Sequence, residues 1–83
     1  MKVQVRYFAS LREALGAAET VDAAEGSTVG SLRDSLIARG GRHADSLARG
    51  RAVRCALNQR MCSDADALAD GAELAFFPPV TGG

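Results

Sequence analysis

The residues whose types and spacing could do chemistry are the last eight, Phe-Phe-Pro-Pro-Val-Thr-Gly-Gly, residues 76–83. Gly82 and Gly83 have no Cβ, so this stretch can thread a narrow channel and lie close to another protein's catalytic groups. Pro78 and Pro79 fix φ and stiffen the base of the segment. The sequence therefore predicts a reactive tail over residues 78–83, including Val80 and Thr81, whose working group is the carboxylate of Gly83.

A carboxylate at this position needs outside help before it can react. A C-terminal carboxyl has a pKa of about 3.3–3.7, so it is ionised at neutral pH and is a poor electrophile. The simplest activation is an acyl-adenylate made from ATP. Gly40-Gly41 is no phosphate loop, because it lacks the Gly-Lys-Ser/Thr ending and does not follow a strand. We therefore expect a separate enzyme to use the ATP, and no cofactor to be bound by this chain. The activated carbonyl could accept sulfur, giving a thiocarboxylate, or an amine, giving an isopeptide.

Composition limits the classes of partner. The chain has 83 residues, with 10 basic and 10 acidic side chains that cancel at pH 7. A single domain without basic excess argues against nucleic acid or an anionic membrane as the main partner. No apolar run approaches the roughly 20 residues that span a bilayer, and residues 1–6 alternate polar and apolar types, unlike a signal peptide. The expected location is the cytoplasm.

Three other side chains could carry chemistry, namely Cys55, Cys62 and His43. They are too few for a closed tetrahedral zinc site, so we expect no bound metal. The cysteines lie seven positions apart and form no Cys-x-x-Cys motif. The simplest interpretation is two buried or half-buried small hydrophobes, and a redox or disulfide role is the alternative. We expect a solvated or capping role for His43, which lies near a helix end, and a solvated surface for the arginines scattered between residues 39 and 54.

Five stretches have the alternation or β propensity of strands. They are residues 3–8, 18–23, 52–57, 61–62 and 73–77. Asn58-Gln59 and Asp70-Gly71 are predicted turns, residues 63–68 a turn or a single helical turn, and Pro78 ends the last strand.

Two stretches predict helices. Ser10 and Glu13 have capping-box spacing at the start of a short helix that Gly16 can end. Ser27-Thr28 offers the cap of a longer amphipathic helix, in which Val29, Leu32 and Leu36 recur at helical spacing and which Gly40-Gly41 stops.

This order of elements predicts an α+β domain over residues 1–77, with a mixed sheet packed on one side by the main helix. Alternation places Phe8 and Phe77 on the open face and the following residues on the covered face: Val3, Val5, Tyr7, Leu74 and Phe76. Exposing a large apolar side chain forgoes about 1.5–3 kcal/mol of burial. Two exposed aromatics side by side therefore indicate a partner surface, unless a bulge reverses the alternation and makes one of them core.

The sequence resembles a known family, the small sulfur-carrier subunits of molybdopterin synthase. The most specific part is the segment from Phe76 to Gly83. Supporting parts are Val5-Arg6-Tyr7-Phe8-Ala9 with Leu11-Arg12-Glu13, Ala56-Leu57-Asn58-Gln59, and Leu68 with Asp70-Gly71. Ala72 departs from the family, which commonly has an acidic residue there; the departure affects a turn and not the chemistry.

The resemblance implies a ubiquitin-like β-grasp fold in which an E1-like enzyme adenylates Gly83, which then becomes a thiocarboxylate. The tail would enter the large synthase subunit and pass sulfur to cyclic pyranopterin monophosphate, within a heterotetramer. The chain would donate sulfur without being a catalyst by itself. Partner contacts would come from Phe8, Met61 and Phe77, from the tail residues Pro78 to Thr81, and from Arg12 toward the activating enzyme.

Three alternatives remain open. The chain could carry sulfur for thiamine or cysteine synthesis, although the aromatic Pro-Pro-Val-Thr lead-in favours the pterin pathway. It could be a protein modifier joined through Gly83 to lysines of other proteins. It could also be a plain binding module whose tail is incidental, in which case deletion of Gly82-Gly83 would leave its function intact.

Overall fold

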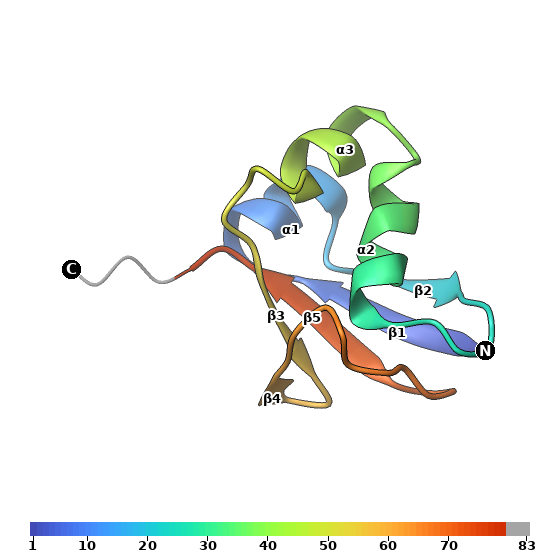
Figure 1. Ribbon diagram of the computed structural model, residues 1–83. Helices are drawn as coiled ribbons and strands as arrows, with labels where there is room; N and C mark the ends of the chain where they lie inside the picture. Colours follow the sequence, from blue (N-terminus) through green and yellow to red (C-terminus); the bar gives the residue numbers. More distant parts are fainter. Residues whose placement is uncertain (80–83) are drawn as a thin grey trace.

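The computed structural model describes residues 1–79 as a sheet with helices on one side. The elements in chain order are β1 (Lys2–Tyr7), α1 (Ala9–Leu15), β2 (Ala18–Asp22), α2 (Val29–Ile37), α3 (Gly41–Leu47), β3 (Arg54–Leu57), β4 (Arg60–Met61) and β5 (Glu73–Phe77). The five strands lie in the order β2-β1-β5-β3-β4. The central pair β1–β5 is parallel and the other pairs are antiparallel. All three helices cover the same face of the sheet (Figure 1). The predicted α+β architecture is confirmed.

The core lies between this sheet face and the helices. In β1, Val3, Val5 and Tyr7 are at most 1% exposed, and in β5 the same holds for Leu74 and Phe76. The helices contribute Leu11, Val29, Leu32, Leu36 and Leu47. Each fully buried large apolar side chain contributes about 1.5–3 kcal/mol relative to its exposure. The predicted alternation of covered and open faces is therefore confirmed.

The main helix begins where the sequence predicts. Thr28 is the N-cap of α2, and its Oγ1 accepts a hydrogen bond from the Ser31 N–H at 3.2 Å. The Ser31 Oγ accepts in return from the Thr28 N–H at 2.9 Å. This reciprocal capping box satisfies two N–H groups that have no partner within the helix. Beyond the other end, Gly40 and Gly41 have φ values of 75° and 55°, which glycine adopts without a steric penalty.

The predicted capping box of the first helix is wrong. α1 begins at Ala9, its N-cap is Phe8, and no side-chain cap bond is formed. The reason is the sheet: the Phe8 N–H donates to the Phe76 carbonyl at 3.1 Å, while the Phe8 carbonyl already accepts from the Leu11 N–H at 3.1 Å. Ser10 is therefore inside the helix. Gly16 follows α1 with φ of 94°, and the predicted C-terminal stop is confirmed.

Helix α3 is not predicted from the sequence, in which this region is expected to form a solvated surface. The helix is short, begins at glycine and lacks a side-chain cap, so its local signals are weak. Tertiary contacts stabilise it instead. Leu47 is fully buried, and Arg33, which is 8% exposed, donates from Nε to the Leu47 carbonyl at 2.8 Å and from Nη2 to the Ala48 carbonyl at 2.9 Å. These bonds satisfy carbonyls at the end of α3.

The third and fourth strands are shorter or shifted relative to the prediction. β3 begins at Arg54 rather than Ala52, and β4 covers Arg60–Met61 rather than Met61–Cys62. The predicted Asn58-Gln59 turn is confirmed, with φ values of 50° and 69° at its two central residues. Asn58 anchors the turn to β5, because its side chain accepts from the Glu73 N–H at 3.0 Å and its own N–H donates to the Glu73 carbonyl at 2.8 Å.

Candidate functional site

The end of β5 directs two neighbouring aromatics to opposite faces of the sheet. Phe76 is 1% exposed and stacks on Tyr7 in the core, with ring centroids 6.3 Å apart. Phe77 is half-buried on the open face. Pro78 and Pro79 follow directly, so the chain leaves the sheet beside the Phe77 ring. The burial of Phe76 thus fixes both the position of Phe77 and the start of the tail segment.

Phe8 reaches the same face by extending the β1–β5 ladder. Tyr7 pairs with Phe76 in register, and the Phe8 N–H bond to the Phe76 carbonyl keeps the next residue extended. Its ring therefore points away from the core and is 41% exposed. The Arg6 guanidinium lies 5.7 Å from the ring centroid, and Arg6 Nη1 lies 3.6 Å from Glu73 Oε1. A cation–π contact of this exposed kind contributes about 0.5–1 kcal/mol.

Phe8 and Phe77 line one shallow hollow of about 570 Å³ on the open face. Its other lining residues are Arg6, Ala9, Ala56, Gln59, Glu73, Ala75 and Pro78. Ala56 pairs with Ala75 and with Met61 in register, so these three side chains share the open face. Met61 is 60% exposed. We name Phe8, Phe77, Ala56, Ala75 and Met61 the docking surface, because exposed apolar side chains gathered in this way are typical of a surface that binds a partner. The small alanines between the large residues leave room for the hollow.

The predicted site residues divide into three groups. Phe8, Phe77, Met61 and Pro78 lie on or beside the docking surface, and Pro79 lines a second hollow on the helix side of β3. Arg12 is exposed on α1. It is not among the described residues that line the hollow beside Phe8 and Phe77. The remaining four, Val80, Thr81, Gly82 and Gly83, lie outside the described residues.

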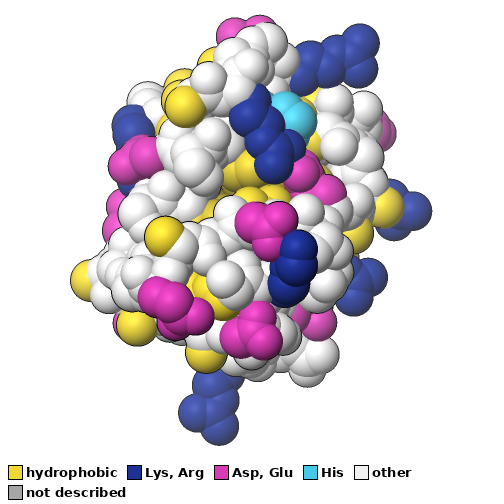
Figure 2. Space-filling view, turned by 90° about the vertical axis from the view of Figure 1, so that its right-hand side faces the viewer, with side chains coloured by type: hydrophobic (Ala, Val, Ile, Leu, Met, Phe, Trp, Pro, Cys, Tyr) yellow, Lys and Arg dark blue, Asp and Glu magenta, His cyan; other side chains and the backbone are white. Residues whose placement is uncertain are grey.

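One polar cluster around Glu19 is not predicted from the sequence. Tyr7 donates from its hydroxyl to Glu19 Oε2 at 2.9 Å, Arg39 Nη1 lies 2.6 Å from Glu19 Oε1, and His43 Nε2 lies 3.2 Å from Glu19 Oε2. On the face shown in Figure 2, the histidine lies among basic and acidic side chains. The only signal in the sequence was a tyrosine on the covered face, whose hydroxyl needs a partner when buried.

The cluster has a definite charge state. Burial raises the pKa of Glu19, but hydrogen bonds from Arg39, Tyr7 and His43 outweigh burial, so its pKa lies below the ordinary value. Burial, followed by the hydrogen bond to Glu19, raises the pKa of Tyr7 well above its usual range. An ionised Glu19 therefore accepts from a neutral Tyr7. Because these residues join β1, β2, α3 and the segment after α2, the cluster stabilises the fold.

Residues 1–79 contain no group of three or more His, Cys, Asp or Glu side chains placed to hold a metal ion. No helix in this part of the chain is long and apolar enough to cross a membrane.

The chain is similar along nearly its whole length to proteins of a known family. Residues 5–83 match the ThiS family. The chain is 43% identical over 81 residues to the molybdopterin synthase sulfur carrier subunit of Escherichia coli, covering 98% of this chain and 99% of that protein.

Two solved structures share the fold. The small archaeal modifier protein 1 of Haloferax volcanii has a TM-score of 0.77 at 27% identity, with 95% of this chain and 98% of that chain covered. The complex of subunits 1 and 2 of the molybdopterin-converting factor from Helicobacter pylori has a chain with a TM-score of 0.71 at 25% identity, and both chains are fully covered. The ubiquitin-like β-grasp fold is thereby established. With its match over nearly the whole length, the chain belongs to the ThiS family, alongside the sulfur carrier subunits of molybdopterin synthase.

Proposed function

We propose that this chain is the sulfur carrier of a molybdopterin synthase. Its Gly83 carboxylate is adenylated, converted to a thiocarboxylate, and donates its sulfur to cyclic pyranopterin monophosphate. Family membership and the name of the 43% identical Escherichia coli relative support the pathway. The chain supplies the sulfur nucleophile, and it is a co-substrate rather than a catalyst by itself.

The observation that carries the proposal is the position of the docking surface relative to the tail. Phe8 and Phe77 line the same hollow, and Pro78, the first residue beyond β5, lines it as well. Four residues follow Pro79 and the last of them is Gly83, so an extended chain would reach at most about 14 Å beyond Pro79. When a partner binds the docking surface, the Gly83 carboxylate can therefore reach only those groups of the partner that lie within this distance of Pro79. Docking then sets the depth at which Gly83 can react.

Two partners use this arrangement in turn. An E1-like enzyme binds ATP and transfers adenylate to the Gly83 carboxylate, releasing pyrophosphate. A large synthase subunit then receives the thiocarboxylate and supplies the acid–base groups and the cations that hold the substrate. The Helicobacter pylori neighbour, a complex of subunits 1 and 2, supports a large-subunit partner. Two carriers on a dimer of large subunits would make the heterotetramer. We place these steps in the cytoplasm.

Intact mass spectrometry tests the proposal. The chain is incubated with ATP, an E1-like enzyme and a sulfur donor, and its mass should rise by the difference between one sulfur and one oxygen atom, localised to Gly83. The proposal requires Gly83 to be the last residue in the cell, which the same measurement on the native protein establishes. A variant lacking Gly82-Gly83 is the control and should not change. An unchanged mass of the full chain under activating conditions would overturn the proposal.

A second candidate function is protein modification through Gly83. The structural likeness to the Haloferax volcanii small archaeal modifier protein 1 favours it. Digests of cell extract would then contain lysines of other proteins joined to a peptide from this chain that ends in Gly82-Gly83. Their presence, without the oxygen-for-sulfur exchange at Gly83, would favour the modifier over the sulfur carrier.

A further inference from the structure

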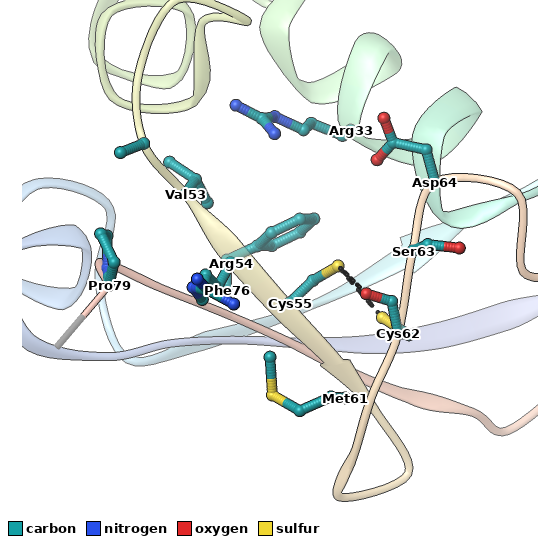
Figure 3. A pocket seen from close by; sticks show the side chains of 11 residues that line it. Arg33, Val53, Arg54, Cys55, Met61, Cys62, Ser63, Asp64, Phe76 and Pro79 are labelled. Atoms are coloured by element: carbon teal, nitrogen blue, oxygen red, sulfur yellow. Dashed lines mark hydrogen bonds between the residues drawn. The ribbon is translucent and has the colours of Figure 1, made fainter.

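A second hollow, of about 500 Å³, lies on the helix side of β3 at the base of the tail segment. Its lining includes both cysteines of the chain, together with Arg33, Val53, Met61 and Pro79. Figure 3 shows the sulfur atoms of Cys55 and Cys62 next to each other in the lining of this hollow, joined by a dashed line. The proposed sulfur transfer through Gly83 uses neither thiol.

The backbone sets the two thiols opposite each other. Cys55 lies in β3 and Cys62 directly follows β4, and the Cys62 N–H donates to the Cys55 carbonyl at 3.2 Å. They form the cross-strand pair next to Ala56–Met61. The Cys62 thiol donates to the Cys55 Sγ at 3.0 Å. Both thiols are free and half-buried, so a small reagent can reach them from the hollow.

The surroundings of the thiols give them different roles. Burial, followed by the hydrogen bond to Cys55, raises the pKa of Cys62 to about 12, so this thiol keeps its proton and donates it. The Cys55 thiol in turn donates to the Cys62 carbonyl at 3.6 Å. Arg33 lines the same hollow as the two thiols. Since Cys62 is the thiol held protonated, Cys55 takes the role of nucleophile and Cys62 that of resolving partner.

We propose that Cys55 and Cys62 form a reversible redox site, which a low-molecular-weight disulfide oxidises to an intramolecular disulfide. Cys55 loses its proton to water, and the resulting thiolate attacks one sulfur of the reagent and expels a thiolate, leaving a mixed disulfide. Cys62 then gives its proton to the expelled thiolate and attacks the Cys55 sulfur, expelling a second thiolate, which takes up a proton from water. In total the protein loses two electrons and two protons, and the reagent becomes two thiols.

The closing step requires little movement. A disulfide has an S–S length of about 2.05 Å, so the sulfurs, now 3.0 Å apart, must approach by about 1 Å. The bond would tie the segment after β4 to β3. Met61 of the docking surface is the residue before Cys62, so oxidation would fix the hairpin that carries it.

The test uses the full chain with an unmodified Gly83 carboxylate, verified by intact mass, because a thiocarboxylate would itself react with disulfides. Oxidised glutathione should lower the mass by two hydrogen atoms and reduce the number of maleimide-reactive thiols from two to none. Dithiothreitol should restore both. Peptide mapping should find Cys55 joined to Cys62.

Matched single variants separate the two roles. Cys62→Ser should accumulate a glutathione adduct on Cys55, whereas Cys55→Ser should form its adduct on Cys62 more slowly. A native chain that keeps glutathione on one cysteine, forms disulfide-linked dimers, or remains fully reduced would overturn the proposal. None of these results depends on sulfur chemistry at Gly83. A negative result for the cysteine pair would therefore leave the proposed function untouched, and a failure of the proposed function would leave the cysteine pair untouched.

Discussion

The Phe8 N–H donates to the Phe76 carbonyl at 3.1 Å, and this bond places the two phenylalanine rings on opposite faces of the sheet. Phe76 is buried against Tyr7, whereas Phe8 is 41% exposed beside Phe77. One backbone contact between β1 and β5 thus secures the core and also builds the docking surface. It lies at the end of the last strand, where the tail segment begins.

Neighbouring residues Phe76 and Phe77 offer a matched pair of substitutions. Phe77→Ala should weaken large-subunit binding at least about tenfold, or about 1.4 kcal/mol, while changing the free energy of unfolding little. Phe76→Ala should instead lower the free energy of unfolding by about 3–5 kcal/mol, because it empties a core position. Calorimetric titration and urea denaturation measure the two effects. Phe8→Ala should behave like Phe77→Ala; unfolding of either variant would show that its ring is core.

Stability should depend on pH through Glu19. Since the pKa of folded Glu19 lies below its ordinary value of 4.5, the ionised carboxylate stabilises the fold above the unfolded pKa. This contribution is lost as the pH falls below 4.5 through the folded pKa. Urea denaturation should therefore show Glu19→Gln to be less stable than the native chain near neutral pH, with a smaller difference at about pH 3. The exposed Glu25→Gln serves as the control, and a difference for Glu19→Gln that does not vary with pH would contradict this role.

Gly30 in α2 should resist a substitution that usually helps a helix. Alanine is favoured over glycine in a helix interior by about 1 kcal/mol. Here an added Cβ would lie 2.9 Å from the Asp64 Cβ and 3.2 Å from the Asp64 carbonyl oxygen. Gly30→Ala should therefore destabilise the fold by about 1–3 kcal/mol in thermal or urea denaturation.

Gly50 is the matched control for that experiment, because a Cβ there meets nothing within 4 Å. Gly50→Ala should be neutral or stabilise by about 0.4–1 kcal/mol, since it restricts the unfolded chain. Equal effects at Gly30 and Gly50 would show that the close approach of α2 to Asp64 is absent in solution.

The turn between β3 and β4 should improve with glycine. Asn58 and Gln59 both have positive φ, as a two-residue type I′ turn requires, and Asn-Gly is its preferred sequence. Gln59→Gly should raise the free energy of unfolding by about 0.5–1 kcal/mol, because glycine has no Cβ penalty at positive φ. A lower denaturation midpoint for this variant would mean that the Gln59 side chain, which lines the docking hollow, contributes more to packing than the turn gains.

Alternation predicted the two faces of the sheet correctly because strand side chains have a strict period of two. Val3, Val5 and Tyr7 had to share a face, which left Phe8 on the other. Thr28 was predicted as a cap for a similarly local reason. These features depend on residues close together in the sequence.

The missed features depend on distant residues. α3 is secured by Arg33, which is 14 and 15 positions from the carbonyls it binds. The start of α1 depends on Phe76, far along the chain, and not on the capping pattern at Ser10. The Glu19 cluster joins residues separated by 12 to 24 positions. Neither periodicity nor capping motifs report such contacts, so the sequence alone could not predict them.

The most direct test of sulfur carriage is a single-turnover transfer experiment. The chain, loaded at Gly83 with radiolabelled sulfur, is mixed with the large subunit and cyclic pyranopterin monophosphate, and the label is followed by gel filtration and chromatography. The account predicts that the label moves from the chain to the small-molecule product, and more slowly for Phe77→Ala. Label that stays on the chain, or is released as free sulfide without a labelled pterin, would contradict it.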